Sequence, residues 1–345
     1  MAAPGSDSFV HEAPDLQVMA DRVRLHVVTG KGGVGKTTVA AALATALATG
    51  GRRVLVCEVE GRQGLAPLFG TAPLGYEERL IARTDGGGEV FGLSVEPKAA
   101  LLEYLEIFYH LGRAGRVLER MGAVDFATTV APGLRDVLLT GKVYEAVRRR
   151  EAGGHVYDAV VLDAPPTGRV VRFLNVNEEV VGLAKVGPVR NQAGSIMAVL
   201  RNPATAVHLV TLLEEMPVQE TLDGVQELRA ARLPVGAVVV NGVRDPLIAQ
   251  RSLTAASRGR LDREQVLAGL AAALPGRGPA DLDAIADGLL ETAREHGVRV
   301  ALQARLRESL EAAARPIAQL PALDGGVDLG ALHPLAQRLR EQGLR

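Results

Sequence analysis

The stretch GKGGVGKTT runs from Gly30 to Thr38 and joins two segments with different patterns of apolar residues. Before it, residues 24–29 (RLHVVT) form a short run rich in β-branched side chains, which is typical of a buried strand. After it, residues 36–49 are rich in alanine and predict a helix that can pack closely on a sheet. A glycine-rich loop between a strand and a helix indicates a phosphate-binding site, because backbone N–H groups and the helix N-terminus attract anions.

The spacing within this loop assigns a chemical role to individual residues. Gly30, Gly35, Lys36 and Thr37 satisfy the phosphate-loop pattern G-x-x-x-x-G-K-[ST]. In that pattern the lysine reaches the β and γ oxygens of a nucleotide, and the hydroxyl group ligates Mg²⁺. The predicted cofactors are therefore ATP or ADP and Mg²⁺. The loop residues predicted to bind them are Gly30, Lys31, Gly32, Gly33, Val34, Gly35, Lys36, Thr37 and Thr38.

A second lysine, Lys31, distinguishes this loop from an ordinary phosphate loop. The chain has only five lysines among its 39 basic residues, yet two of the five lie here. The sequence GKGGVGKTT resembles the deviant Walker A motif of a class of dimeric P-loop ATPases that includes the ArsA/GET family. The resemblance implies that Lys31 reaches across a dimer and stabilises charge on the partner's nucleotide, as an arginine finger does elsewhere. The alternative is a solvated loop lysine.

Further segments resemble the ArsA/GET family, in family order and over almost the whole chain after residue 20. Residues 163–174 (DAPPTGRVVRFL) are similar to its second switch, DTAPTGHTLRFL, and residues 217–221 (PVQET) also match. The resemblance is nearest to the actinobacterial ArsA-like ATPases. It implies that Asp163, which follows a predicted strand, orients water on Mg²⁺ and joins Thr37 at the metal. It also implies that Asn241 contacts adenine and that Pro321 lies in a loop over the base.

The first switch departs from the family pattern. Where the family has S-T-D-P-A-H, this chain has EVEGRQ, and Glu60 takes the position of the aspartate that positions the attacking water. A glutamate can still orient or activate water. A displacement of about 1 Å can cost roughly 10²-fold in rate, so slow hydrolysis is expected. A binding module with negligible hydrolysis is the alternative. The residues predicted to be catalytic are Lys31, Lys36, Glu60 and Asp163.

Thiolate chemistry is disfavoured because Cys57 is the only cysteine. A zinc-binding Cys-x-x-Cys pair and an iron–sulfur cluster both need several thiolates. The three-cysteine metalloid site of arsenite-pump ATPases is missing for the same reason. We therefore expect no zinc, no iron–sulfur cluster and no arsenite-stimulated transport.

The remaining apolar runs predict an α/β fold, a P-loop NTPase with a mostly parallel sheet covered by helices on both faces and an inserted helical subdomain. Further strands are predicted at 53–60, 90–95, 157–162, 206–211 and 235–240. The predicted divisions are a flexible tail (1–20), the first part of the ATPase core (21–98), a helical insert (99–150), the core with the second switch (151–180), the second part of the insert (181–202), and the core with adenine-binding loops and C-terminal helices (203–345).

Charge and hydropathy limit the expected partners. A net charge of −1 and 3% aromatic residues argue against nucleic-acid binding. No apolar run is long enough to cross a bilayer, so a cytoplasmic protein is expected. The resemblance implies a homodimer or a heterodimer with a paralogous ATPase, and a groove for a hydrophobic client between the inserted helices, unless these helices only pack on the core. Residues 331–345 predict a helix docked on the core rather than a MinD-like membrane-cycling tail.

Overall fold

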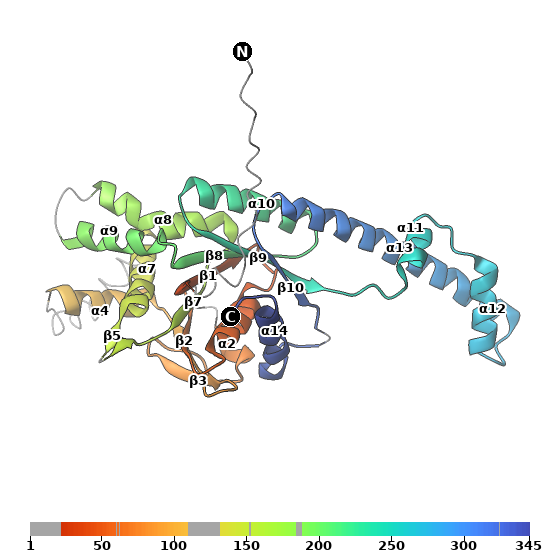
Figure 1. Cartoon of the computed structure of the whole chain (residues 1–345), viewed down its shortest axis with the longest axis horizontal. Helices are drawn as coiled ribbons and strands as arrows, with labels where there is room; N and C mark the ends of the chain where they lie inside the picture. The colour runs from red at the N-terminus through yellow and green to blue at the C-terminus, as the bar shows by residue number, and fades with distance from the viewer. Residues whose placement is uncertain are drawn as a thin grey trace, which may run out of the picture. The chain divides into compact units, whose positions relative to one another are not determined.

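The computed structural model (Figure 1) describes residues 22–59, 61, 63–109, 132–151, 153–183, 188–323 and 325–345. These residues form two compact units. The first runs to Leu212 and also takes in Met216–Val243 and Ala313–Arg345, and the second comprises Leu213–Glu215 and Arg244–Ala312. The tail predicted for residues 1–20 lies outside the described residues.

The first unit is built on an eight-stranded sheet in the order β10-β9-β8-β1-β7-β2-β4-β3. Seven strands run parallel, and only β3, at one edge, pairs antiparallel with its neighbour. The predicted, mostly parallel sheet is therefore confirmed. The strands are β1 (Leu25–Gly30), β2 (Arg53–Glu58), β3 (Arg79–Arg83), β4 (Glu89–Ser94), β7 (Ala159–Asp163), β8 (Thr205–Thr211), β9 (Val235–Val243) and β10 (Ile317–Pro321). A separate hairpin pairs β5 (Arg150–Glu151) with β6 (Gly154–His155).

Two helices, α2 (Lys36–Ala48) and α14 (Leu329–Glu341), pack against each other on one face of the sheet. Side chains alternate along a strand, so Val28 and Val161 point into this layer while their neighbours point to the other face. The side chains of Leu332, Leu335 and Leu339 on α14 are fully buried. This burial agrees with the predicted core-docked helix.

The opposite face carries α4 (Pro97–Tyr109), α7 (Pro132–Arg148), α8 (Thr167–Leu183) and α9 (Pro188–Leu200). The helices α4, α7 and α9 come mainly from the stretches predicted as the insert, whereas α8 comes mainly from the stretch predicted as core with the second switch. In Figure 1 they lie together, and α4 packs on α7 while α7 packs on α8 and α9. Pro132 begins α7, as expected for a residue without an N–H at the first helical position. Residues 110–131 of the insert lie outside the described part of the chain.

Two other helices of the first unit follow strands. α3 (Leu65–Leu68) is a single turn after β2, and α10 (Glu215–Ala230) connects β8 to β9. Within the described residues, no helix is both long and apolar enough to cross a membrane.

The second unit is helical and comes from the stretch assigned in the sequence to the C-terminal core. It consists of α11 (Gln250–Ser257), α12 (Arg263–Ala273) and α13 (Pro279–Glu311). Gly297 of α13 lies so close to α11 that a Cβ there would be 2.7 Å from Ser257 N. Arg263 of α12 forms ion pairs with Asp283 and Asp287 of α13, each at 2.8 Å.

Two histidines are buried in the centre of the sheet. The distance from His26 Nδ1 on β1 to His208 Nε2 on β8 is 3.1 Å, and the rings stack. Because the Ala237 N–H donates to His208 Nδ1, neutral His208 carries its proton on Nε2 and donates to His26. Burial, and then the neighbouring His208, lowers the pKa of His26 well below its usual value. Burial lowers the pKa of His208 to about 4.

This pair makes folding stability dependent on pH. Both pKa values are lower in the folded chain than in the unfolded chain, so the unfolded chain binds more protons below about pH 6.5. Between pH 7.5 and 5.5, urea unfolding should show a loss of roughly 1–3 kcal/mol from the pair. In a His26→Gln/His208→Gln variant, the free energy of unfolding should fall less between pH 7.5 and 5.5. An equal loss in the variant would contradict this account.

Candidate functional site

The loop after β1 is shaped by close contacts with neighbouring strands. A Cβ on Gly30 would lie 2.2 Å from Val210 O of β8, so any larger residue would collide with the backbone. Gly35 has a φ of 88° and is the N-cap of α2. A Cβ there would be 2.3 Å from Asn241 Nδ2 of β9. Both glycines are therefore required by geometry.

A cavity of about 270 Å³ lies at the N-terminus of α2. It opens beside the carboxyl ends of β2 and β7, where ligands bind in open α/β sheets. The helix N-terminus contributes a partial positive charge, which favours an anion. The residues lining the cavity are Gly33, Gly35, Lys36, Thr37, Thr38, Glu58, Val59, Gly64, Asp163 and Ala164.

Three residues assigned from the sequence meet in this cavity. The Thr37 hydroxyl donates a hydrogen bond to Asp163 Oδ2 at 2.7 Å. The Lys36 ammonium is buried and donates to Lys31 O at 3.1 Å, within the loop. A hydroxyl and a carboxylate are oxygen ligands of the kind that Mg²⁺ prefers, so the residues present fit this ion.

The loop is also tied to the segment after β7. The Thr29 hydroxyl at the end of β1 donates to Pro165 O at 2.7 Å. Pro165 lies two residues after Asp163 and precedes α8, which begins at Thr167. A displacement of this segment would therefore break this hydrogen bond or move Thr29, which immediately precedes the phosphate loop.

Lys31 points elsewhere. Its ammonium forms an ion pair with Glu220 Oε1 of α10 at 2.7 Å, and both side chains are about one-third exposed. Lys31 is not among the residues that line the cavity. Glu220 lies in the PVQET segment, and the sequence alone did not mark it as a partner for Lys31.

The two residues assigned to adenine lie on neighbouring strands. Asn241 is on β9, and its side chain donates to Val34 O of the phosphate loop at 2.9 Å. Pro321 ends β10 in register with Val243 of β9 and is exposed. Neither residue lines the cavity at the N-terminus of α2. Asn241 thus supports the loop, and contact with a base stays a prediction for both residues.

The first switch is only partly described. Glu60 lies outside the described residues, so its predicted role stays a prediction. Glu58, two residues earlier, is described, is 3% exposed and lines the cavity. The sequence pattern did not single out Glu58, because the family resemblance places the water-orienting carboxylate at Glu60. A carboxylate at the end of a buried parallel strand was the available signal.

Cys57 is fully buried on β2. Burial raises the pKa of its thiol far above the usual value, which keeps it protonated and unreactive.

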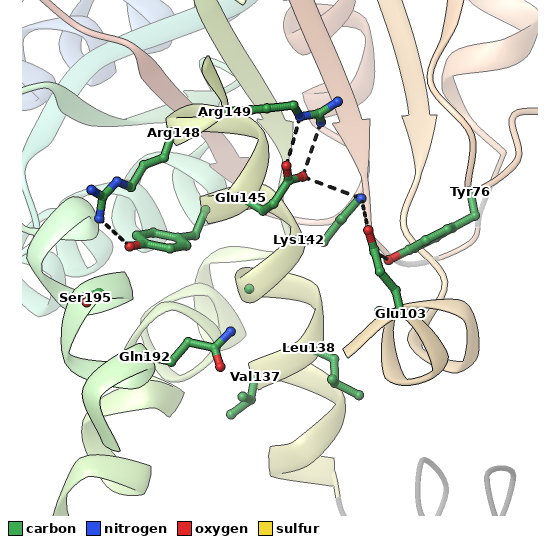
Figure 2. Close-up of a pocket in the computed structure, with 13 residues that line it drawn as sticks. Tyr76, Glu103, Val137, Leu138, Lys142, Glu145, Arg148, Arg149, Gln192 and Ser195 are labelled. Carbon is green, nitrogen blue, oxygen red and sulfur yellow. Dashed lines mark hydrogen bonds and ion pairs between the residues drawn. The ribbon is translucent and has the colours of Figure 1, made fainter. Parts of the chain in front are cut away.

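A second cavity, of about 450 Å³, lies among the inserted helices (Figure 2). One wall is charged, and Lys142 of α7 bridges Glu103 of α4 and Glu145 of its own helix. Arg149 pairs with Glu145 and Glu78. The remaining lining includes the apolar side chains Ala100, Val137 and Leu138.

The carboxylates at and beside this wall have partners within the protein. Although burial alone would raise the pKa of Glu78, hydrogen bonds from Arg149 and Tyr157 lower it. Burial and the hydrogen bond to Glu103 raise the pKa of Tyr76. These carboxylates are therefore occupied with partners inside the protein, and the cavity offers mainly its apolar surface to a ligand.

Comparisons with known proteins agree with this geometry. A family model described as Anion-transporting ATPase matches residues 23–203, which is more than half of the chain. The chain is 50% identical over 324 residues to ATPase BagA of Mycobacterium tuberculosis and to a putative ATPase of Mycobacterium bovis, and each alignment covers 94% of both proteins. It is 26% identical over 280 residues to ATPase GET3 of Rhodotorula glutinis, covering 71% of this chain and 77% of the relative. The protein therefore belongs to the ArsA/GET family of anion-transporting ATPases.

Proposed function

We propose that the protein is a dimeric conformational switch that binds ATP with Mg²⁺ and hydrolyses it slowly. The observation that carries this proposal is the convergence of Lys36, Thr37 and Asp163 on one cavity at the N-terminus of α2. This arrangement offers a cation and helix dipole for phosphates, and two oxygen ligands for a divalent ion, within one site.

Each residue has a defined task in this proposal. Lys36 and the loop N–H groups bind the phosphates, and Thr37 and Asp163 hold the Mg²⁺ ion. When bound, Mg²⁺ neutralises charge on the phosphate oxygens. The bond from Thr29 to Pro165 connects the loop to the segment after Asp163, which gives a route from the state of the nucleotide to the inserted helices.

Dimerisation is proposed to bring Lys31 into the partner's site. In the single chain Lys31 is paired with Glu220, so it must exchange this partner for the nucleotide. A partly exposed ion pair of this kind contributes about 0.2–1 kcal/mol, so the exchange is energetically easy. The partner is a second copy or a paralogous ATPase in the cytoplasm.

A hydrophobic client is a second candidate feature of the same function. The cavity among α4, α7 and α9 has an apolar lining beside a charged wall, where Lys142 and Arg149 already form ion pairs (Figure 2). Apolar surface between helices is the type of site that receives an amphipathic helix.

The two loop lysines should separate nucleotide binding from catalysis. Lys36→Ala should abolish ATP binding. Lys31→Ala should leave the monomer's ATP affinity within about twofold, because its side chain lies outside the cavity, yet reduce hydrolysis by roughly 10³-fold or more, as the loss of an arginine finger does. Fluorescent-nucleotide binding and single-turnover hydrolysis measure the two effects. Lys98→Ala on α4 is the control, and equal binding losses in both loop variants would contradict the assignment.

Glu220→Gln should favour the dimer. It removes the carboxylate that holds Lys31 within its own chain, so ATP-dependent dimerisation should tighten by up to about fivefold per site. Analytical ultracentrifugation with a non-hydrolysable ATP analogue measures this change. The matched control is Asp223→Asn on the same helix. An unchanged or weaker dimer would show that Glu220 does not compete for Lys31.

Asn241→Ala tests whether this residue supports the loop or reads the base. Loss of its bond to Val34 O should weaken binding of ATP, GTP and inorganic triphosphate alike, by about two- to tenfold. Competition binding with the three ligands measures the pattern. A loss confined to ATP would assign Asn241 to adenine recognition.

A further inference from the structure

Glu58 places a second carboxylate beside the proposed metal site. It is the last residue of β2 and lies in register with Asp163, the last residue of β7. Adjacent parallel strands are about 4.8 Å apart, so the two residues project from the same edge of the sheet. Both line the cavity that also contains the hydroxyl-bearing Thr37.

The two oxygens of Glu58 have different surroundings. Oε2 accepts a hydrogen bond from the Leu65 N–H at 3.3 Å, at the start of α3. Oε1 is buried and has no hydrogen-bond partner among the described residues. A buried carboxylate oxygen without a donor is unfavourable, and nearly all such oxygens in native proteins are bonded to protein or ordered water. We therefore expect Oε1 to accept a hydrogen bond from a group bound in the cavity.

The charges around the cavity indicate that this donor is bound to a cation. Two carboxylates side by side in a cavity repel each other unless a cation lies nearby. Among the described residues that line the cavity, Lys36 carries the positive side chain, and its proposed partners are the nucleotide phosphates. A divalent cation with its bound water satisfies both requirements, because the ion balances the charge and the water supplies the donor. Mg²⁺ retains several waters when bound to proteins.

We propose that Glu58 is a positioning residue of the magnesium site, where its Oε1 accepts a hydrogen bond from a water bound to the ion that Thr37 and Asp163 hold. This inference rests on the proposed function. Its chemistry is that of an outer carboxylate that orients a metal's ligands. The strand ladder fixes Glu58 through the pairing of Cys57 with Leu162 and of Glu58 with Asp163.

The alternative is a structural role, in which Glu58 only receives the Leu65 N–H. Glu58→Gln separates the two roles, because the amide oxygen of glutamine can still accept that bond while the charge is lost. A structural role predicts the same behaviour with and without Mg²⁺. A role at the metal predicts a change that depends on Mg²⁺.

The test is a magnesium chloride titration of the full-length protein at a fixed concentration of fluorescent ADP. Glu58→Gln should raise the Mg²⁺ concentration for half-maximal binding by about tenfold or more. Its affinity for the nucleotide in EDTA should be unchanged or higher, because a negative charge near the phosphates is gone. Its melting temperature without metal should be at least that of the wild type, with a smaller increase on adding Mg²⁺ and ADP.

The matched control is Glu89→Gln, which removes a carboxylate at the start of β4 that pairs with Arg53 and Arg83. It should leave the magnesium titration unchanged. If Glu58→Gln does not fold, Glu58→Asp keeps the charge on a shorter side chain and should show a smaller shift in the same direction.

An unchanged titration in Glu58→Gln, or a full shift in Glu60→Gln with none at Glu58, would overturn the inference. An equal loss of melting temperature with and without metal would assign Glu58 to structure alone and also overturn it. A wild-type protein that shows no Mg²⁺-dependent nucleotide binding would instead refute the proposed function.

Discussion

The close approach of the phosphate loop to its neighbouring strands is the constraint on which the site depends. Gly30 lies against the backbone of β8 at Val210, and Gly35 lies against Asn241 of β9, so the loop is held by two strands that are distant in sequence. These contacts hold the loop at the N-terminus of α2, where the cavity lies. The central position of β1 between β7 and β8 makes that packing possible.

The distribution of charge around this loop is consistent with the proposed ATP-dependent dimer. Lys36 and the N-terminus of α2 contribute positive charge to the cavity. Asp163 and Glu58 contribute carboxylates at the ends of two neighbouring strands. Lys31 is held away from the cavity by Glu220. The cavity of a single chain therefore lacks the second lysine, and the Lys31–Glu220 ion pair is weak enough to be exchanged in the proposed dimer.

The sequence predicted the central architecture because its signals were local and redundant. Apolar runs located β1, β2, β4, β7, β8 and β9. Motif spacing pointed to Lys36 and Thr37, the family resemblance pointed to Asp163, and all three line one cavity. Strands β3 and β10 were not predicted, since β3 is a half-exposed edge strand and β10 is short and ends in proline. The ion pair between Lys31 and Glu220 joins residues 189 positions apart, so no pattern in the sequence predicts it. The separation of Arg244–Ala312 into its own unit is likewise a property of tertiary contacts that helical patterning does not encode.

The central claim is that Lys31 acts on the nucleotide of the partner, and mixing two inactive variants tests it most directly. Lys31→Ala lacks the crossing lysine, and Asp163→Asn lacks the metal carboxylate, so neither should hydrolyse ATP alone. In an equal mixture, about a quarter of wild-type turnover should return, because half of the dimers are mixed and each carries one complete site. If Lys31 acted within its own chain, no mixed dimer would contain a complete site, and the mixture would stay inactive.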